Sequence, residues 1–244
     1  MLWIAVITTA VISYLIGSFP SGYLAGRAHG LDLRKEGSGN VGATNALRVL
    51  GKKIGYTVFA ADIFKGWLAV MTSYVIVLLY TQMTNASQDL SVSSILNFLV
   101  GSTPAPPLTI RFGILGAICG MLGHIFPIWL GFKGGKGIAT AGGIMIALFP
   151  IQVFLAGISV WLILFFATRY VSIASIGAAI TLPTASGILL LMGKCDALRL
   201  WIAGVMCVLA IWRHKSNIQR LLAGTEKKFE KKLPPQTPSD NSHV

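Results

Sequence analysis

Charged residues are scarce in this sequence, and acidic ones are the scarcest. Only 11% of the 244 residues are charged, with 8 Asp and Glu against 20 Lys and Arg, whereas soluble domains average about 25%. This argues against a soluble protein. A net charge of +12 would suggest nucleic acid as a partner of a soluble chain. Here the basic residues stand in short loops, where they orient a membrane protein and attract anionic lipids, so we expect membrane lipids and no nucleic acid.

Cysteine and histidine are also few. The 3 cysteines form no CxxC pair, which leaves neither a disulfide framework nor a zinc site. The 4 histidines are too scattered along the chain to hold a metal ion together. We therefore expect no metal and no cofactor.

Long apolar runs fill most of the chain instead. A span of hydrocarbon needs about 20 mainly apolar residues, and the sequence supplies about seven such runs. The predicted spans are 2–25 with a kink at Pro20, 55–80, 112–130, two short spans within 138–168 that turn near Pro150, 172–192 and 197–213. They predict an all-α, polytopic membrane protein with one membrane domain over residues 1–224. The charged residues 225–244 predict a disordered tail, and 81–110 is the longest predicted loop.

The loop charges predict the orientation of these spans. Most Lys and Arg residues fall in loops on one side, and only Arg111, Lys194 and Arg199 fall on the other. By the positive-inside rule the basic side is cytoplasmic. The N-terminus is then outside and the C-terminus is cytoplasmic.

A glycine-rich polar stretch follows the first predicted span. Its glycines let backbone N–H groups point into one concavity that binds anions, and Arg48 adds a bidentate group for phosphate. The predicted phosphate-binding residues of this stretch are Gly37, Ser38, Gly39, Asn40, Thr44, Asn45 and Arg48. The stretch also matches GxGxxG, but a membrane span precedes it in place of a strand, which excludes a dinucleotide fold. The alternative is a flexible polar connector.

A second glycine-rich loop, 131–137, opens the fourth predicted span. Free N–H groups and the positive dipole end of a helix favour phosphate there. We expect Gly134, Gly135, Lys136 and Gly137 to bind it. The loop is not a Walker A motif. Lys133 stands beside Phe132 and fits an interfacial anchor, whereas Lys136 stands among glycines and fits a ligand.

Other polar residues stand at or within the predicted spans. Ser175 lies early in the sixth span, and His214 and Asn217 follow the seventh on one helical face. Taken singly they fit helix caps and anchors, but all three polar clusters fall on one side of the membrane. Asp62 and Lys65, one turn apart inside the second span, predict a buried ion pair with a structural role.

These clusters resemble the motifs of a known family. LDLRKEGSGNVGATNALRVLG, from Leu31 to Gly51, is similar to the first motif of the bacterial acyl-phosphate:glycerol-3-phosphate acyltransferases (PlsY). GHIFP from Gly123 and GFKGGKGIAT up to Thr140 resemble the second. RYVSIAS, ending at Ser175, and the later RHxxN, ending at Asn217, resemble the third. The His-x-x-x-x-Asp dyad of acyl-CoA-dependent acyltransferases does not occur.

The resemblance implies a bacterial inner-membrane enzyme whose active site faces the cytoplasm. It implies transfer of a fatty acyl group from acyl phosphate to glycerol 3-phosphate, which gives lysophosphatidic acid for phospholipid synthesis. An upstream partner would be the enzyme that makes acyl phosphate. The family's functional residues match Ser38, Arg48, Lys136, Ser175, His214 and Asn217. Either the phosphate of the donor or His214 would accept the proton of the glycerol hydroxyl.

Two other classes of function remain open from the sequence. A transporter of phosphate or organic anions would suit glycine-broken helices and intramembrane charge, but it needs matching sites in two internal repeats, which are not evident. A non-catalytic membrane scaffold would not need three polar motifs on one side.

Overall fold

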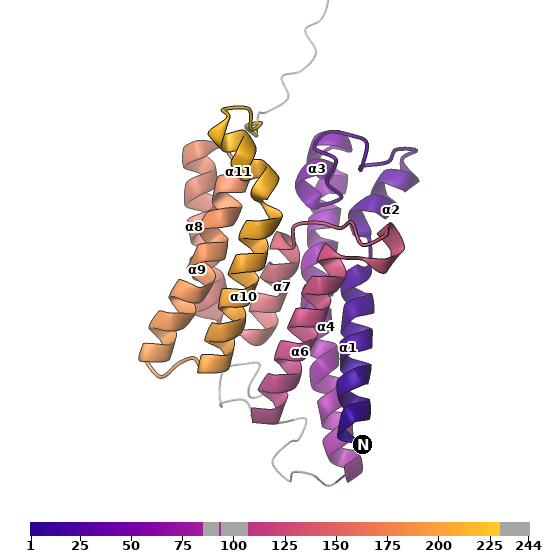
Figure 1. Cartoon of the computed structure of the whole chain (residues 1–244), viewed down its shortest axis with the longest axis vertical. Coiled ribbons are helices and arrows are strands. Elements are labelled where there is room, and N and C mark those ends of the chain that lie inside the picture. The colour runs from indigo at the N-terminus through magenta and orange to yellow at the C-terminus, as the bar shows by residue number, and fades with distance from the viewer. Residues whose placement is uncertain (85–92, 94–106, 230–244) are drawn as a thin grey trace, which may run out of the picture.

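A computed structural model describes residues 1–84, 93 and 107–229 (Figure 1). Within these residues the chain forms helices and no strand. In chain order the helices are α1 (Leu2–Ser18), α2 (Ser21–Ala28), α3 (Ala43–Val49), α4 (Lys52–Thr84), α6 (Pro107–Ile125), the 3-10 helix η1 (Ile128–Leu130), α7 (Ile138–Leu148), α8 (Ile151–Thr168), α9 (Val171–Leu191), α10 (Ala197–Arg213) and α11 (Lys215–Leu222). The predicted all-α class is confirmed.

Several of these helices are long and apolar enough to cross a bilayer. In the described part of the chain there are 5 such segments, and there are 6 if α10 and α11, which are bent by 54°, are counted as one span. Helix α7 is apolar but has only 11 residues, a rise of about 16 Å against a hydrocarbon core of about 30 Å. The multi-pass membrane protein is thus confirmed, while a seventh span through α7 stays a prediction.

Proline sets two of the helix boundaries. Helix α1 ends just before Phe19 and Pro20, and α2 begins directly after them, as predicted from the missing proline N–H. Helix α7 ends before Pro150 and α8 starts after it, so the predicted break there is also confirmed. Helix α4 continues to Thr84 and α6 starts at Pro107, which shortens the predicted loop 81–110 at both ends. Most of that loop lies outside the described residues.

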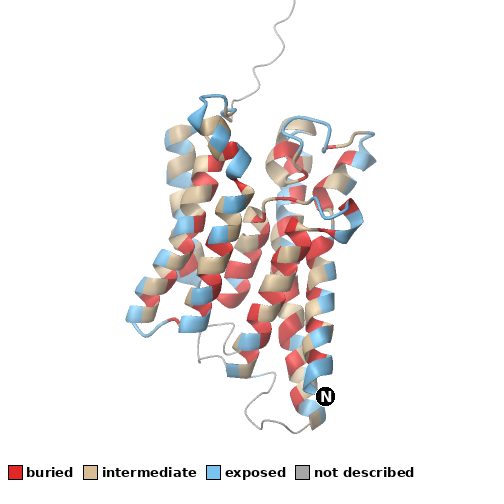
Figure 2. Cartoon of the chain, in the orientation of Figure 1, coloured by how far each residue is buried: buried red, intermediate tan, exposed pale blue. Residues whose placement is uncertain are grey.

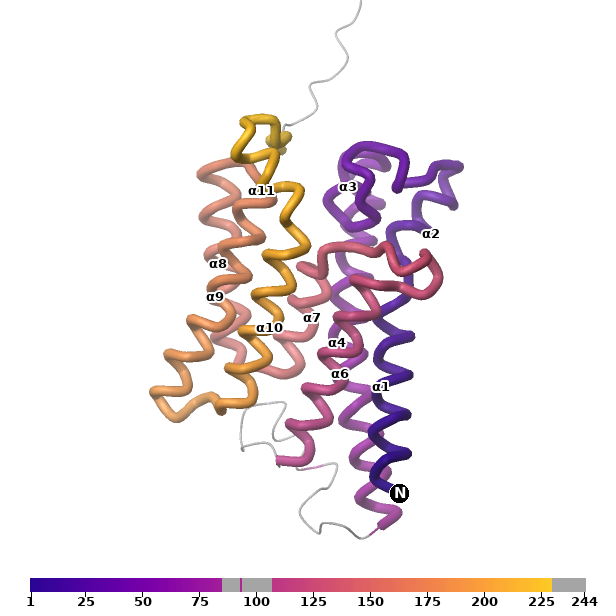
Figure 3. The backbone as a smooth tube through the Cα atoms, in the orientation of Figure 1, coloured from indigo at the N-terminus to yellow at the C-terminus, as the bar shows by residue number. Residues whose placement is uncertain are grey.

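The helices form two neighbouring groups (Figure 3). Helices α1, α4, α6 and α7 pack on one another, and α8, α9 and α10 form the second group. The core lies where α4, α6 and α7 meet, around the fully buried Val70, Ile144 and Leu148. Figure 2 shows buried residues concentrated there, whereas the outer faces are exposed, as lipid-facing surfaces are. Only Val153 and Gly157 of α8 are buried.

Successive long helices alternate in direction, so several connections meet at one end of the bundle. Helices α2, α3 and α11 and the segment between α6 and α7 all lie in the half of the bundle opposite the N-terminus (Figure 1). The polar clusters of the sequence therefore come together at one end.

Candidate active site

The first glycine-rich loop is shaped by Asn45. The Asn45 side chain is 1% exposed, accepts a hydrogen bond from Ser38 N at 2.8 Å and donates to the carbonyls of Leu33 at 3.1 Å and Glu36 at 2.9 Å. Gly37 has a φ of +63°, and a Cβ there would lie 2.3 Å from Asn45 Oδ1. The polar groups of the Asn45 side chain therefore have partners within the loop, and phosphate binding by this residue stays a prediction.

Asn40 also acts inside the loop. Its side-chain oxygen accepts a hydrogen bond from Gly42 N at 2.7 Å, directly before α3 begins. This arrangement is an Asx turn, which satisfies a free N–H ahead of the helix. Two predicted ligands of this cluster keep more accessible positions: Ser38 is exposed, and Arg48 is half-buried in the last turn of α3. Thr44 is half-buried at the start of the same helix.

The second glycine-rich loop is held through its backbone. Gly134 N and Gly135 N donate to the carbonyls of Ile125 at 3.0 Å and His124 at 3.2 Å. Arg213 donates from Nη2 to the Gly134 carbonyl at 2.8 Å and from Nε to the Gly135 carbonyl at 3.1 Å. The predicted phosphate-binding N–H groups of Gly134 and Gly135 are therefore already engaged. Gly137, with a φ of +85°, starts α7, whose first N–H groups are the ones left for an anion.

Lys136 connects this loop with α11 and with the residues directly after it. Its Nζ donates to Asn217 Oδ1 of α11, and Asn217 Nδ2 donates to Glu226 Oε1 at 2.6 Å. Arg220 donates from Nε to the other carboxylate oxygen of Glu226 at 2.7 Å. Arg48 donates to the carbonyl of Lys227 at 3.3 Å. Two predicted site residues, Lys136 and Asn217, are thus in direct contact. Arg48 contacts the segment after α11 that also contains Glu226.

His214 and Ser175 are both buried. His214, at the junction of α10 and α11, is 2% exposed, and its Nδ1 is 2.7 Å from the Ala210 carbonyl. It interacts electrostatically with Lys136. Ser175 Oγ accepts a hydrogen bond from Trp161 Nε1 of α8 at 3.3 Å. His214 therefore belongs to the Lys136 cluster, whereas Ser175 pairs with the neighbouring helix.

The electrostatics of the site are dominated by positive charge. Burial lowers the pKa of Lys136 to about 8; Glu226 opposes this shift, and Arg220, Arg48 and Arg213 reinforce it. Burial also lowers the pKa of Arg48. For Glu226, burial opposes ionisation, but hydrogen bonds from Asn217 and Arg220 outweigh it and lower the pKa. The result is a cluster of cations around one carboxylate, a setting that attracts phosphate.

Sequence reasoning missed three members of this cluster: Arg213, Arg220 and Glu226. The predicted tail began at residue 225, yet Glu226 contacts α11 and Phe229 N donates to the Arg169 carbonyl at 2.8 Å. Residues 230–244 lie outside the described part. Arg220 could have been found, because it follows Asn217 by one helical turn. Glu226 offers no such local signal.

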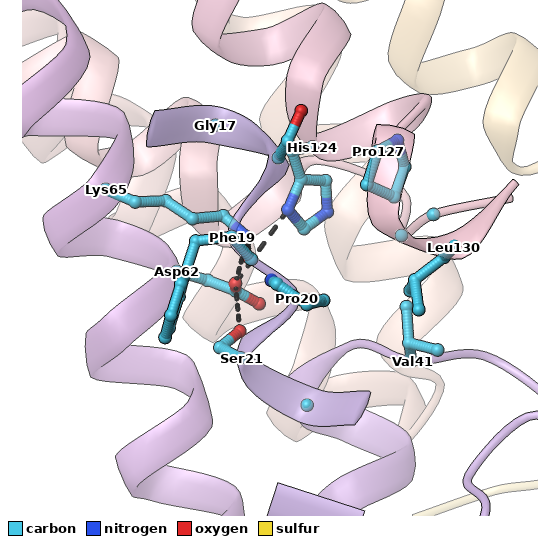
Figure 4. Close-up of a pocket in the computed structure, with 14 residues that line it drawn as sticks. Gly17, Phe19, Pro20, Ser21, Val41, Asp62, Lys65, His124, Pro127 and Leu130 are labelled. Carbon is cyan, nitrogen blue, oxygen red and sulfur yellow. Dashed lines mark hydrogen bonds and ion pairs between the residues drawn. The ribbon is translucent and has the colours of Figure 1, made fainter. Parts of the chain in front are cut away.

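The ion pair that the sequence predicts in the second span lines the same pocket as Gly134 and Gly135 of the second glycine-rich loop. Lys65 Nζ is 2.7 Å from Asp62 Oδ1, and both side chains are buried. Ser21 Oγ donates to the same Asp62 oxygen at 2.6 Å, and Lys65 donates to the Phe19 carbonyl at 2.9 Å (Figure 4). The predicted pair is confirmed, and it ties α4 to the break between α1 and α2.

Fold and site together define an integral membrane protein with a partly buried cationic site at one end of its helix bundle. The profile of the glycerol-3-phosphate acyltransferase family matches residues 7–224. The chain belongs to the glycerol-3-phosphate acyltransferase family.

Individual relatives agree with this assignment. A glycerol-3-phosphate acyltransferase of Synechococcus elongatus is 39% identical over 232 residues, which cover 94% of this chain and 97% of the relative. One of Allorhizobium ampelinum is 37% identical over 230 residues, with 93% and 94% covered. The crystal structure of PlsY (YgiH), an integral membrane glycerol 3-phosphate acyltransferase in its glycerol 3-phosphate form, has a TM-score of 0.70 and 35% identity. That match covers 92% of this chain and 96% of PlsY. The lysophosphatidic acid form of PlsY gives a TM-score of 0.68.

Proposed function

We propose that this protein transfers a fatty acyl group from acyl phosphate to glycerol 3-phosphate, releasing lysophosphatidic acid and phosphate. The observation that carries the proposal is the contact of Lys136 with Asn217, next to Arg48 and His214. These residues come from three separate sequence clusters and meet in one cationic site. Such a site suits a reaction in which both substrates carry a phosphate. The solved PlsY forms carry glycerol 3-phosphate and lysophosphatidic acid in their names, which fits the same chemistry.

The reaction does not need a covalent nucleophile from the protein. The hydroxyl oxygen of glycerol 3-phosphate attacks the carbonyl carbon of acyl phosphate, and the bond from that carbon to the phosphate oxygen breaks. The leaving phosphate carries the bonding electron pair away and accepts the hydroxyl proton, or His214 accepts it first. Acyl phosphate is a mixed anhydride with a good leaving group, so positioning and charge neutralisation suffice.

Each site residue then has a role. Lys136 and Arg48 neutralise phosphate charge, and Asn217 fixes the Lys136 ammonium. Ser38 and Ser175 supply hydroxyl groups for substrate contact. Glu226 holds Asn217 and Arg220 and thereby orders the wall of the site contributed by α11.

We predict turnover with acyl phosphate and none with acyl-CoA. The reason is the lack of the His-x-x-x-x-Asp dyad together with a site built for a phosphate leaving group. Purified protein is incubated with labelled glycerol 3-phosphate and either palmitoyl phosphate or palmitoyl-CoA, and lysophosphatidic acid is measured. Product from palmitoyl-CoA with an equal release of CoA would contradict the donor assignment. No product from either donor would contradict the proposed function.

The proposal includes a topology of about seven membrane spans, in which the short helix α7 crosses the membrane as one of the spans. The N-terminus would be outside and the site would face the cytoplasm of a bacterial inner membrane. We predict that Glu36→Cys and Lys133→Cys, both exposed at the site end, react with an impermeant thiol reagent only from the cytoplasmic side. Lys194→Cys, between α9 and α10, should react from outside. The variants are made after replacing the 3 native cysteines by serine, and the reverse labelling pattern would refute the orientation.

We also predict a loss of activity at alkaline pH that arises from Lys136. Its pKa of about 8 means that it is cationic below that pH and neutral above it. The ratio kcat/KM reports ionisations of the free enzyme, so kcat/KM for glycerol 3-phosphate should fall up to about tenfold per pH unit above about pH 8. Lys136→Arg should be slower but should keep a flat profile to about pH 9.5, because guanidinium stays charged. Rates are corrected for spontaneous hydrolysis of the donor. A parallel fall in Lys136→Arg would assign the ionisation to another group.

A further inference from the structure

A buried polar network lies next to the second glycine-rich loop, and the proposed mechanism does not use it. Its centre is the Asp62–Lys65 pair, with Ser21 on the same carboxylate (Figure 4). His124 of α6 extends it: His124 Nδ1 is 3.8 Å from Asp62 Oδ1 and 3.0 Å from Thr140 Oγ1 of α7. Thr140 is fully buried, and His124 is 7% exposed. The network therefore connects three helices to the imidazole ring of His124.

The His124 ring packs closely against Gly135 of the second glycine-rich loop. A Cβ placed on Gly135 would lie 2.2 Å from His124 Nε2, so only glycine lets the backbone pass this ring. The carbonyl of His124 also accepts the hydrogen bond from Gly135 N at 3.2 Å. The ring therefore packs directly against the backbone of Gly135.

Arg213 holds the same two glycines through their carbonyl oxygens. The next residue along the chain is Lys136, whose ammonium meets Asn217. The position of the lysine thus follows from a peptide segment that is fixed by His124 and by Arg213.

We propose that His124 is a positioning residue: its ring, oriented by Thr140, supports Gly135 and thereby sets where Lys136 meets the phosphate of glycerol 3-phosphate. The inference rests on the proposed function, because the ligand of Lys136 is taken to be that substrate. It assigns a function to a histidine that does not itself touch substrate.

Two substitutions at Thr140 test the proposal. Thr140→Val removes the hydroxyl group that contacts the His124 ring and leaves the side-chain volume almost unchanged. Thr140→Ser keeps the hydroxyl group. Thr140→Val should raise KM for glycerol 3-phosphate about 10-fold with kcat changed less than about 3-fold, whereas Thr140→Ser should stay within about 2-fold. Thr81→Val is the matched control, because Thr81 is also buried in the helix bundle but its hydroxyl bonds the Leu78 carbonyl, in the last turns of α4. The control should change the melting temperature without changing KM.

A double substitution separates positioning from general damage. Gly135→Ala and Thr140→Val displace the same ring, so their combined effect on KM should be smaller than the product of the single effects. Multiplying effects, or an unchanged KM in folded Thr140→Val, would overturn the proposal. If Thr140→Val does not fold, Thr140→Ala carries the same expectation. Wild-type protein without turnover would overturn the proposed function and this inference with it, whereas an active wild type with unaffected Thr140 variants would overturn the inference alone.

Discussion

Replacing Lys136 by methionine is expected to lower kcat/KM for glycerol 3-phosphate by about 30- to 1000-fold, while Lys133→Met changes it little. Lys136 is half-buried and hydrogen-bonded to Asn217, so its loss removes a charge-assisted contact worth roughly 2–4 kcal/mol with a substrate phosphate. Lys133 is exposed, two residues before the buried Gly135, and fits an interfacial anchor. The two lysines share one loop, which makes Lys133→Met a closely matched control.

The measurement is kcat/KM in detergent for both variants, with acyl phosphate saturating. A thermal melt of each variant shows whether it is folded. Equal losses in the two variants, or a larger loss in Lys133→Met, would show that the wrong lysine has been placed in the site.

The second large effect is expected on stability. Lys65→Met leaves the Asp62 carboxylate buried without its cation, and breaking a buried ion pair in this way costs about 3–5 kcal/mol. The double substitution Asp62→Asn with Lys65→Met removes both charges and keeps an acceptor for Ser21, so it should recover a large part of the loss.

The chain offers a matched exposed pair as the control. Arg34 and Asp32 are also 2.7 Å apart, but the Arg34 side chain is 42% exposed. Arg34→Met should therefore lower the melting temperature much less than Lys65→Met does. Melting temperatures of the three variants and the wild type are compared in one detergent. A double variant less stable than Lys65→Met, or an equal loss in Arg34→Met, would contradict the buried-pair account.

Sequence periodicity and composition were enough for the class of fold. Apolar runs long enough for a bilayer can be recognised from the sequence of the segment itself. The breaks at Pro20 and Pro150 can be recognised in the same way, because the missing proline N–H disrupts the helix that contains it. The ion pair of Asp62 and Lys65 was likewise predictable, since its members are one helical turn apart. The different roles of Lys133 and Lys136 were also predicted from neighbouring residues, and they stay a prediction.

Only the tertiary structure decided which polar groups are left for a substrate. Asn45 had the right chemistry for a phosphate ligand, but its side chain is used by the carbonyls of Leu33 and Glu36. Gly134 and Gly135 had the right backbone, but their N–H groups bond the end of α6. Hydrogen-bonding capacity is a property of a residue, whereas its availability depends on which partners the fold brings near.

The same reason explains the residues that were missed. Arg213 reaches Gly134 and Gly135 from a different helix, and Lys136 meets Asn217 across 81 positions of sequence. Glu226 was assigned to a tail, because charge and proline content describe a segment on its own and not the cations that it will meet. The sequence by itself determined the helices, their breaks and the chemical groups present. The contacts that α10 and α11 make with the loop between α6 and α7 determined which of these groups lie together, because electrostatic and hydrogen-bond contacts depend on distance in space.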